Sequence, residues 1–151
     1  MAENKLNLVI PLSDDYIRLA GMALYCYSYY ETFIVSVIAQ IDREFWYKYF
    51  REWALSSGQL KNKFKRIKDE NPQIINLDLV YFQFELIIDR RNRLVHAHPI
   101  TDENEGQILY YQADVNKSVS DFKWTIGELE RFTNDVNQLT SDVSRLRETI
   151  E

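Results

Sequence analysis

The sequence is poor in the residues that disulfides, cysteine-ligated metals and tight turns require. Among its 151 residues are one Cys, four Gly and three Pro. The single cysteine, Cys26, excludes an intrachain disulfide and a zinc site built from cysteines. Because Cys26 has apolar neighbours and no nearby His or cation in sequence, we expect a structural thiol. The few glycines and prolines disfavour a many-turned β-sandwich or barrel.

Long hydrophobic segments are also missing. Residues 19–30 and 32–41 carry no charge, but these segments are too short and too rich in tyrosine to span a bilayer. Residues 1–6 include charged side chains and lack the apolar region of a signal peptide. We therefore expect a cytoplasmic protein without a membrane partner.

Apolar and charged residues are present in proportions typical of a folded domain. Hydrophobic residues make up 46% of the chain, which suffices for the core of one domain spanning residues 1–151. The net charge of −5 disfavours a protein that coats nucleic acid nonspecifically. Residues 51–93 nevertheless hold nine of the 18 Lys and Arg residues, so an anionic partner is expected to bind this segment.

Apolar residues at helical spacing predict an all-α fold, a four- to five-helix up-and-down bundle with a small β-hairpin or extended excursion before the last helix. Ser13, followed by two acidic residues, predicts the N-terminal cap of the first helix. Residues 108–115 are aromatic and β-branched, which indicates the β excursion. The expected helices are residues 16–41, a segment from about residue 42 to a break at Ser56-Ser57-Gly58, residues 60–68, residues 77–98 (ended by Pro99), and a last segment capped by Ser118-Val119-Ser120-Asp121.

Two groups of apolar residues leave alternatives open. Aromatic side chains of the second helix share one face, which is typical of a core, although such rings also stack on nucleic-acid bases. Apolar residues of the last helix alternate spacings of three and four, which indicates either inward packing or a dimerisation helix. The first group is Phe45, Trp46, Tyr49, Phe50 and Trp53, and the second is Leu129, Phe132, Val136, Leu139, Val143, Leu146 and Ile150.

The most informative segment is Arg91-Asn92-Arg93-Leu94-Val95-His96. On a helical wheel Arg91 lies at the centre of an apolar face, while Arg90 and Arg93 lie on the opposite, solvent side. A buried guanidinium without a partner is costly, so Arg91 is expected to be paired or to line a cavity. Asn92 and His96 are four residues apart and flank Arg91 along one edge.

This group of residue types suits chemistry on RNA. A guanidinium binds phosphate and stabilises the charge of a phosphoryl-transfer transition state. An imidazole takes the proton of a 2′-hydroxyl or gives one to a leaving 5′-oxygen. The 2′-hydroxyl is itself the nucleophile, so neither metal nor cofactor is expected. In the alternative interpretation, Arg91 pairs with a carboxylate such as Glu31, and His96 is a structural residue at the helix end.

The segment resembles the R-x4–6-H motif of the HEPN superfamily, with the usual polar residue directly after the arginine. The resemblance implies a helical homodimer in which two motifs face each other, and a metal-independent endoribonuclease that leaves a 2′,3′-cyclic phosphate. It makes Arg91, His96 and Asn92 the catalytic residues, with Glu31 of the first helix as a candidate supporting residue. His98, two residues beyond the motif, is a second candidate supporting residue. It also implies a toxin or phage-defence effector with an antitoxin or nucleotidyltransferase-like partner, or alternatively a non-catalytic binding or regulatory module.

Two further groups complete the expectations. His96 and His98 are two residues apart, so on a helix they point in different directions and do not form a metal site. A run of cations at residues 61–68 is expected either to form a solvated helix face or to contact RNA phosphates. Its members are Lys61, Lys63, Lys65, Arg66 and Lys68.

Overall fold

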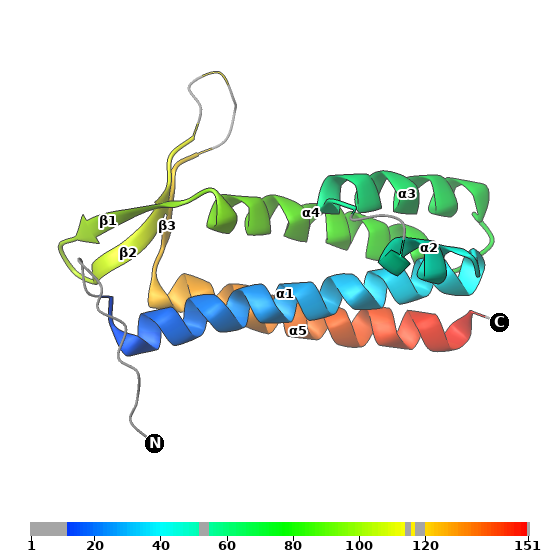
Figure 1. The fold of residues 1–151 in the computed structure, drawn as a ribbon, viewed down its shortest axis with the longest axis horizontal. Helices are drawn as coiled ribbons and strands as arrows, with labels where there is room; N and C mark the ends of the chain where they lie inside the picture. The colour runs from blue at the N-terminus through cyan, green and yellow to red at the C-terminus, as the bar shows by residue number, and fades with distance from the viewer. Residues whose placement is uncertain (1–11, 52–54, 114–115, 117–119, 151) are drawn as a thin grey trace.

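The computed structural model describes residues 12–51, 55–113, 116 and 120–150, without the side chains of residues 50 and 51 (Figure 1). Within these ranges the chain forms helices and a three-stranded antiparallel sheet in the order β1-β2-β3. The elements are α1 (Asp14–Ile41), α2 (Phe45–Arg51), α3 (Ser57–Glu70), α4 (Leu77–Val95), β1 (His98–Asp102), β2 (Gly106–Tyr111), β3 (Phe122–Trp124) and α5 (Ile126–Thr149).

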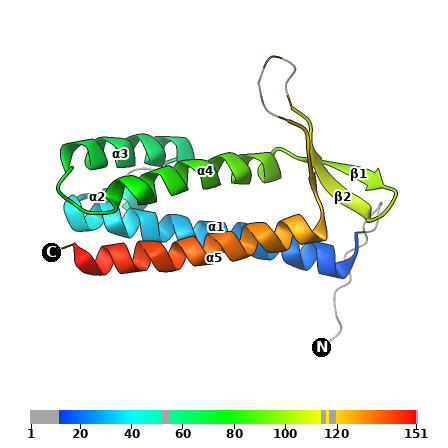
Figure 2. The same ribbon diagram turned by 180° about the vertical axis from the view of Figure 1, so that it is seen from behind.

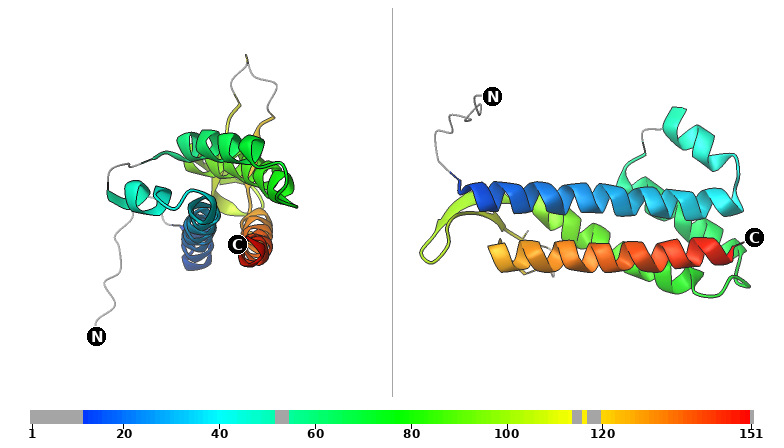
Figure 3. Two further views of the ribbon diagram at one scale, coloured as in Figure 1. Left: turned by 90° about the vertical axis from the view of Figure 1, so that its right-hand side faces the viewer. Right: turned by 90° about the horizontal axis from the view of Figure 1, so that it is seen from below.

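The two longest helices, α1 and α5, run side by side in the same direction along the molecule (Figures 1 and 3). Helix α4 runs back over them, and α3 packs on the first half of α4. The sheet lies at the opposite end of the molecule from α2 and α3 (Figure 2). The expected mostly helical fold with a small β excursion before the last helix is therefore confirmed.

Helix α1 begins where the sequence predicts. The Ser13 hydroxyl accepts the Tyr16 backbone N–H at 3.1 Å, and two acidic residues in the first turn favour the positive end of the helix dipole. Ser56 likewise caps α3 in a capping box with Gln59. The residues Ser56-Ser57-Gly58 are therefore the cap and first turn of α3 rather than a break before a helix at residue 60, and α2 ends earlier, at Arg51.

The apolar seam of α5 packs inside the chain. Its residues Leu129, Phe132, Val136, Val143 and Leu146 are buried, and the remaining two are partly buried against the same core. The inward-packing interpretation is therefore confirmed for this seam. A dimerisation helix would need these side chains on the surface, so that interpretation is wrong.

Two further helix boundaries differ from those expected, and both corrections come from the sheet. Helix α4 ends at Val95 rather than at His98. Pro99 disfavours helical backbone at His98, the residue before it, and both His98 and Pro99 lie in the edge strand β1. The last helix is capped by Thr125, whose hydroxyl accepts the Glu128 N–H at 3.2 Å. The expected cap at Ser118-Val119-Ser120-Asp121 precedes the unpredicted strand β3, and residues 118 and 119 lie outside the described residues.

Tyr16 joins α1 to the sheet. Its hydroxyl donates to the Trp124 carbonyl at 2.6 Å and accepts the Leu109 N–H at 2.8 Å. Leu109 and Trp124 are directly opposite each other in β2 and β3. One buried side chain therefore satisfies a backbone donor and a backbone acceptor from adjacent strands.

We expect Tyr16→Phe to lower the free energy of unfolding by about 1–3 kcal/mol, because it leaves two backbone groups without a partner. Urea denaturation measures this change. Tyr25→Phe is the matched control, because Tyr25 is exposed on the same helix, and its stability should equal that of the wild type. Equal stability of Tyr16→Phe and Tyr25→Phe would contradict the role assigned to Tyr16.

Candidate functional site

The last two turns of α4 position the predicted motif. Arg91 is half-buried, and its guanidinium lies 5.3 Å from the centre of the Tyr27 ring on α1. Its Nη1 donates to Asn92 Oδ1 at 3.1 Å. Arg91 therefore faces the interior side of α4, as the wheel predicts, but its partner there is an aromatic face.

Arg91 forms no ion pair with a carboxylate among the described residues, Glu31 included. The expectation that Arg91 pairs with Glu31 is therefore wrong. A guanidinium has five N–H donors, and the one described hydrogen bond of Arg91, to Asn92, leaves others for an anion.

Glu31 holds Tyr27 in place. The Tyr27 hydroxyl donates to Glu31 Oε2 at 2.8 Å, and the Ser57 hydroxyl donates to the same oxygen at 2.6 Å. Burial, followed by the charge of Glu31, raises the pKa of Tyr27, so its hydroxyl stays protonated and remains a donor. Glu31 therefore acts on Arg91 only through Tyr27: it fixes the Tyr27 ring on which the guanidinium lies.

His96 caps the C-terminal end of α4 and has an exposed side chain. Its backbone N–H donates to the Asn92 carbonyl at 3.0 Å, which places the imidazole one turn beyond Asn92. The structure thus brings Arg91 and Asn92 into contact and leaves the His96 side chain exposed at the end of the helix. His98 lies in β1, paired with Tyr110, and is also exposed.

The other two arginines of the segment differ from the wheel prediction. Arg90 does not point to solvent: it forms an ion pair with Asp135 of α5 at 2.8 Å, and its guanidinium lies 5.2 Å from the centre of the Phe132 ring. Arg93 is half-buried and lines hollows between α4 and α5. The wheel alone does not show that α5 covers this side of α4.

Every cation of the predicted basic run has a carboxylate partner. Hydrogen bonding to Asp69 raises the pKa of Lys68, and hydrogen bonds from Lys65 and Lys68 lower the pKa of Asp69. The run therefore presents paired charges rather than a row of uncompensated cations. The pairs are Lys61–Glu85, Lys63–Asp42, Lys65–Asp69, Arg66–Glu70 and Lys68–Asp69.

The aromatic residues of the second helix and Cys26 are the remaining candidates from the sequence. Phe45 is buried, as expected for a core position, whereas Trp46 is exposed; the Phe50 side chain and Trp53 lie outside the described residues. Cys26 is partly buried against the core. Within the described ranges, no cluster of three or more His, Cys, Asp or Glu side chains is arranged to hold a metal ion.

Comparisons with known proteins add no assignment. The chain matches no protein-family model, and no match was found among curated proteins or solved structures. None of the described helices combines the length and apolar character needed to span a membrane.

The sequence reasoning missed Tyr27 and Ser57. The Tyr27–Glu31 pair has the spacing of four that brings helical side chains together, so this contact was accessible from the sequence. Ser57 was not, because it reaches Glu31 only after α3 folds against α1.

We expect Glu31→Ala to lower the free energy of unfolding by about 1–3 kcal/mol, because the Tyr27 and Ser57 hydroxyls, among others, lose their shared acceptor. Glu70→Ala is the control: Glu70 forms an exposed ion pair with Arg66, so its loss should cost less than about 1 kcal/mol. Urea denaturation of the two variants measures the difference. A smaller effect for Glu31→Ala than for Glu70→Ala would contradict the role of the hydroxyl network.

Proposed function

We propose that this chain is a metal-independent endoribonuclease of HEPN type, with a HEPN-like helical bundle as its fold. The observation that carries the proposal is the state of Arg91: half-buried, seated on Tyr27, in contact with Asn92 and without a carboxylate partner among the described residues. In a chain with more acids than bases, an arginine left in this state is suited to bind an anion from outside.

The proposed reaction uses groups of this chain and of the RNA. The 2′-hydroxyl attacks the adjacent phosphorus, His96 takes the hydroxyl proton or delivers one to the leaving 5′-oxygen, and Arg91 holds the phosphate and its growing negative charge. Asn92 orients the guanidinium through its 3.1 Å hydrogen bond. The products are a 2′,3′-cyclic phosphate and a free 5′-hydroxyl, and no cofactor takes part. His98 remains a proposed supporting residue.

A homodimer would bring a second motif to the first. Exposed apolar side chains on α4 and α1 support this arrangement: Val95 of α4 is 46% exposed, and Leu24 of α1 is 41% exposed. Leu24 precedes Tyr27 by three residues, so the two share a face of α1. Burying this surface against a second copy would also place His96 residues from both protomers close together.

We expect wild-type protein to cleave RNA in EDTA and His96→Ala to lower turnover roughly a hundred- to ten-thousandfold, with RNA binding little changed. Arg91→Ala should reduce both binding and rate. Cleavage of a labelled RNA and analysis of its 3′ ends for cyclic phosphate measure these effects. His98→Ala, at an exposed position outside α4, tests whether the second histidine contributes. Absence of cleavage by a folded, dimeric wild type would contradict the enzyme proposal.

We expect a homodimer by light scattering at micromolar concentration, and we expect Leu24→Asp to convert it to a monomer by placing a charge in the apolar contact. Leu86→Asp is the matched control, because Leu86 is exposed on the side of α4 that faces α5. The molar mass of Leu86→Asp should stay that of the dimer. A monomeric wild type would refute the shared motif.

The second candidate is a non-catalytic binding or regulatory module of a toxin–antitoxin or defence complex. The carboxylate partners along the basic run favour it, because they leave little uncompensated charge for RNA phosphates. Contacts from Lys61, Lys63, Lys65, Arg66 and Lys68 to RNA remain a proposal that requires these ion pairs to open. An antitoxin or nucleotidyltransferase-like partner and a cytoplasmic location belong to the same proposal.

A further inference from the structure

A hollow of about 330 Å³ lies where the end of α4, strand β3 and the start of α5 meet. Arg90 and Arg93 line it from α4, and Arg131 lines it from α5. Two carboxylates, Glu128 and Asp135, also line it, so guanidiniums outnumber carboxylates by one.

The excess charge resides on Arg93. Arg90 pairs with Asp135 at 2.8 Å, and Arg131 pairs with Glu128 at 2.7 Å. Arg93 is half-buried and has no carboxylate partner in the part of the chain that the structure describes. A partly desolvated guanidinium of this kind favours binding of an anion over remaining in contact with water alone.

Trp124 is a further residue in the wall of the same hollow. Its side chain is 1% exposed, and its indole N–H has no acceptor among the described residues. Edge-on contacts with Phe122 and Phe132 hold the ring, with centroid distances of 4.9 and 5.7 Å. A buried donor without an acceptor is unfavourable, so the indole N–H signal is a sensitive reporter of any change in the wall of this hollow.

We propose that this hollow binds a phosphate group, with the fork of Arg93 as its direct donor and Trp124 in its wall. Arg90 and Arg131 flank the bound group and exchange part of their contact with Asp135 and Glu128 for it. The ligand is a phosphate ester, and the phosphate of a free nucleotide and that of an RNA backbone share this chemistry.

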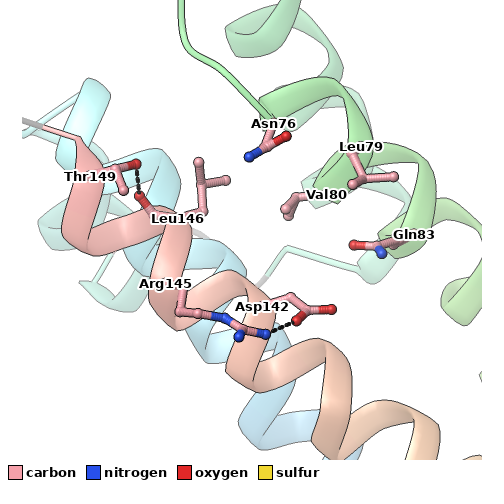
Figure 4. Close-up of a pocket in the computed structure, with 8 residues that line it drawn as sticks. All are labelled: Asn76, Leu79, Val80, Gln83, Asp142, Arg145, Leu146 and Thr149. Atoms are coloured by element: carbon pink, nitrogen blue, oxygen red, sulfur yellow. Dashed lines mark hydrogen bonds and ion pairs between the residues drawn. The ribbon is translucent and has the colours of Figure 1, made fainter.

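A second hollow of the molecule, which has no unpaired cation among the described residues, serves as a comparison. It has a volume of about 360 Å³ and lies between the start of α4 and the end of α5 (Figure 4). Its single cation, Arg145, points along the helix toward Asp142 and is paired with it. A paired cation carries no excess charge, so this hollow is not expected to bind phosphate.

The proposed site is separate from the motif chemistry. Arg91 and Arg93 are two residues apart on a helix, so they point to nearly opposite sides of α4. Arg91 contacts α1, whereas Arg93 lines the hollow beside α5. Phosphate binding at Arg93 therefore does not require that the protein cleaves RNA.

The test is a titration of ¹⁵N-labelled full-length protein with inorganic phosphate, against chloride at equal ionic strength, followed through the tryptophan indole N–H signals. The chain has three tryptophans, so Trp124→Phe assigns the signal directly. Trp46→Phe and Trp53→Phe assign it by elimination in case Trp124→Phe does not fold. We expect the Trp124 signal to shift and saturate at millimolar phosphate.

Arg93→Gln should weaken this binding about tenfold or more, because it removes a charge-assisted pair of hydrogen bonds. Arg145→Gln changes the net charge equally and should leave binding unchanged. Parallel titrations use a nucleoside 5′-monophosphate and a short RNA. Saturation by RNA at lower concentration identifies the RNA backbone as the source, and equal saturation identifies a free nucleotide.

Two outcomes would overturn the proposal. One is the absence of a saturable Trp124 shift with all three ligands. The other is an equal loss of phosphate affinity in Arg93→Gln and Arg145→Gln, because the loss would then follow from the change in net charge alone.

Discussion

The packing of α5 along the length of α1 is the contact on which the other elements depend (Figure 1). Each fully buried aliphatic or aromatic side chain in this contact stabilises the fold by about 1.5–3 kcal/mol relative to exposure. The apolar seam of α5 supplies such side chains in almost every turn. With α1 and α5 fixed as a pair, α4 finds a partner on each side: Tyr27 of α1 under Arg91, and Asp135 of α5 beside Arg90.

The tyrosines of α1 do more than fill the core. The hydroxyl of Tyr16 reaches the backbone of the sheet, and that of Tyr27 reaches Glu31 and lies beside Ser57 at the start of α3. Tyr30 is fully buried, and its hydroxyl has no partner among the described residues; burial raises its pKa, so it stays neutral. A tyrosine side chain thus combines an apolar ring, which packs in the core, with a polar hydroxyl. The hydroxyl of Tyr16 connects α1 to the sheet, and that of Tyr27 connects α1 to the start of α3.

Sequence patterns predict the parts of this structure that depend on local periodicity and caps. Ser13 and the length of α1 follow from such signals, and so does the inward orientation of Arg91. Strand β3 does not, because three residues carry too little periodicity, and its pairing with β2 decides their conformation. The prediction that Arg90 faces solvent is wrong for a related reason. A helical wheel divides one helix into faces, but only the position of α5 determines which polar face is covered.

The charges around α4 bear on the proposal that this acidic protein binds an anion. The net charge of −5 repels a polyanion at long range, but salt screens that repulsion beyond about 8–10 Å. At short range, Arg91 and Arg93 have no carboxylate partners among the described residues, whereas the cations of residues 61–68 do. Since few phosphates can then be neutralised at once, affinity depends on the geometry around single guanidiniums more than on total charge. Such a surface favours a phosphate at a defined position over nonspecific coating of nucleic acid, which the acidic composition already disfavours.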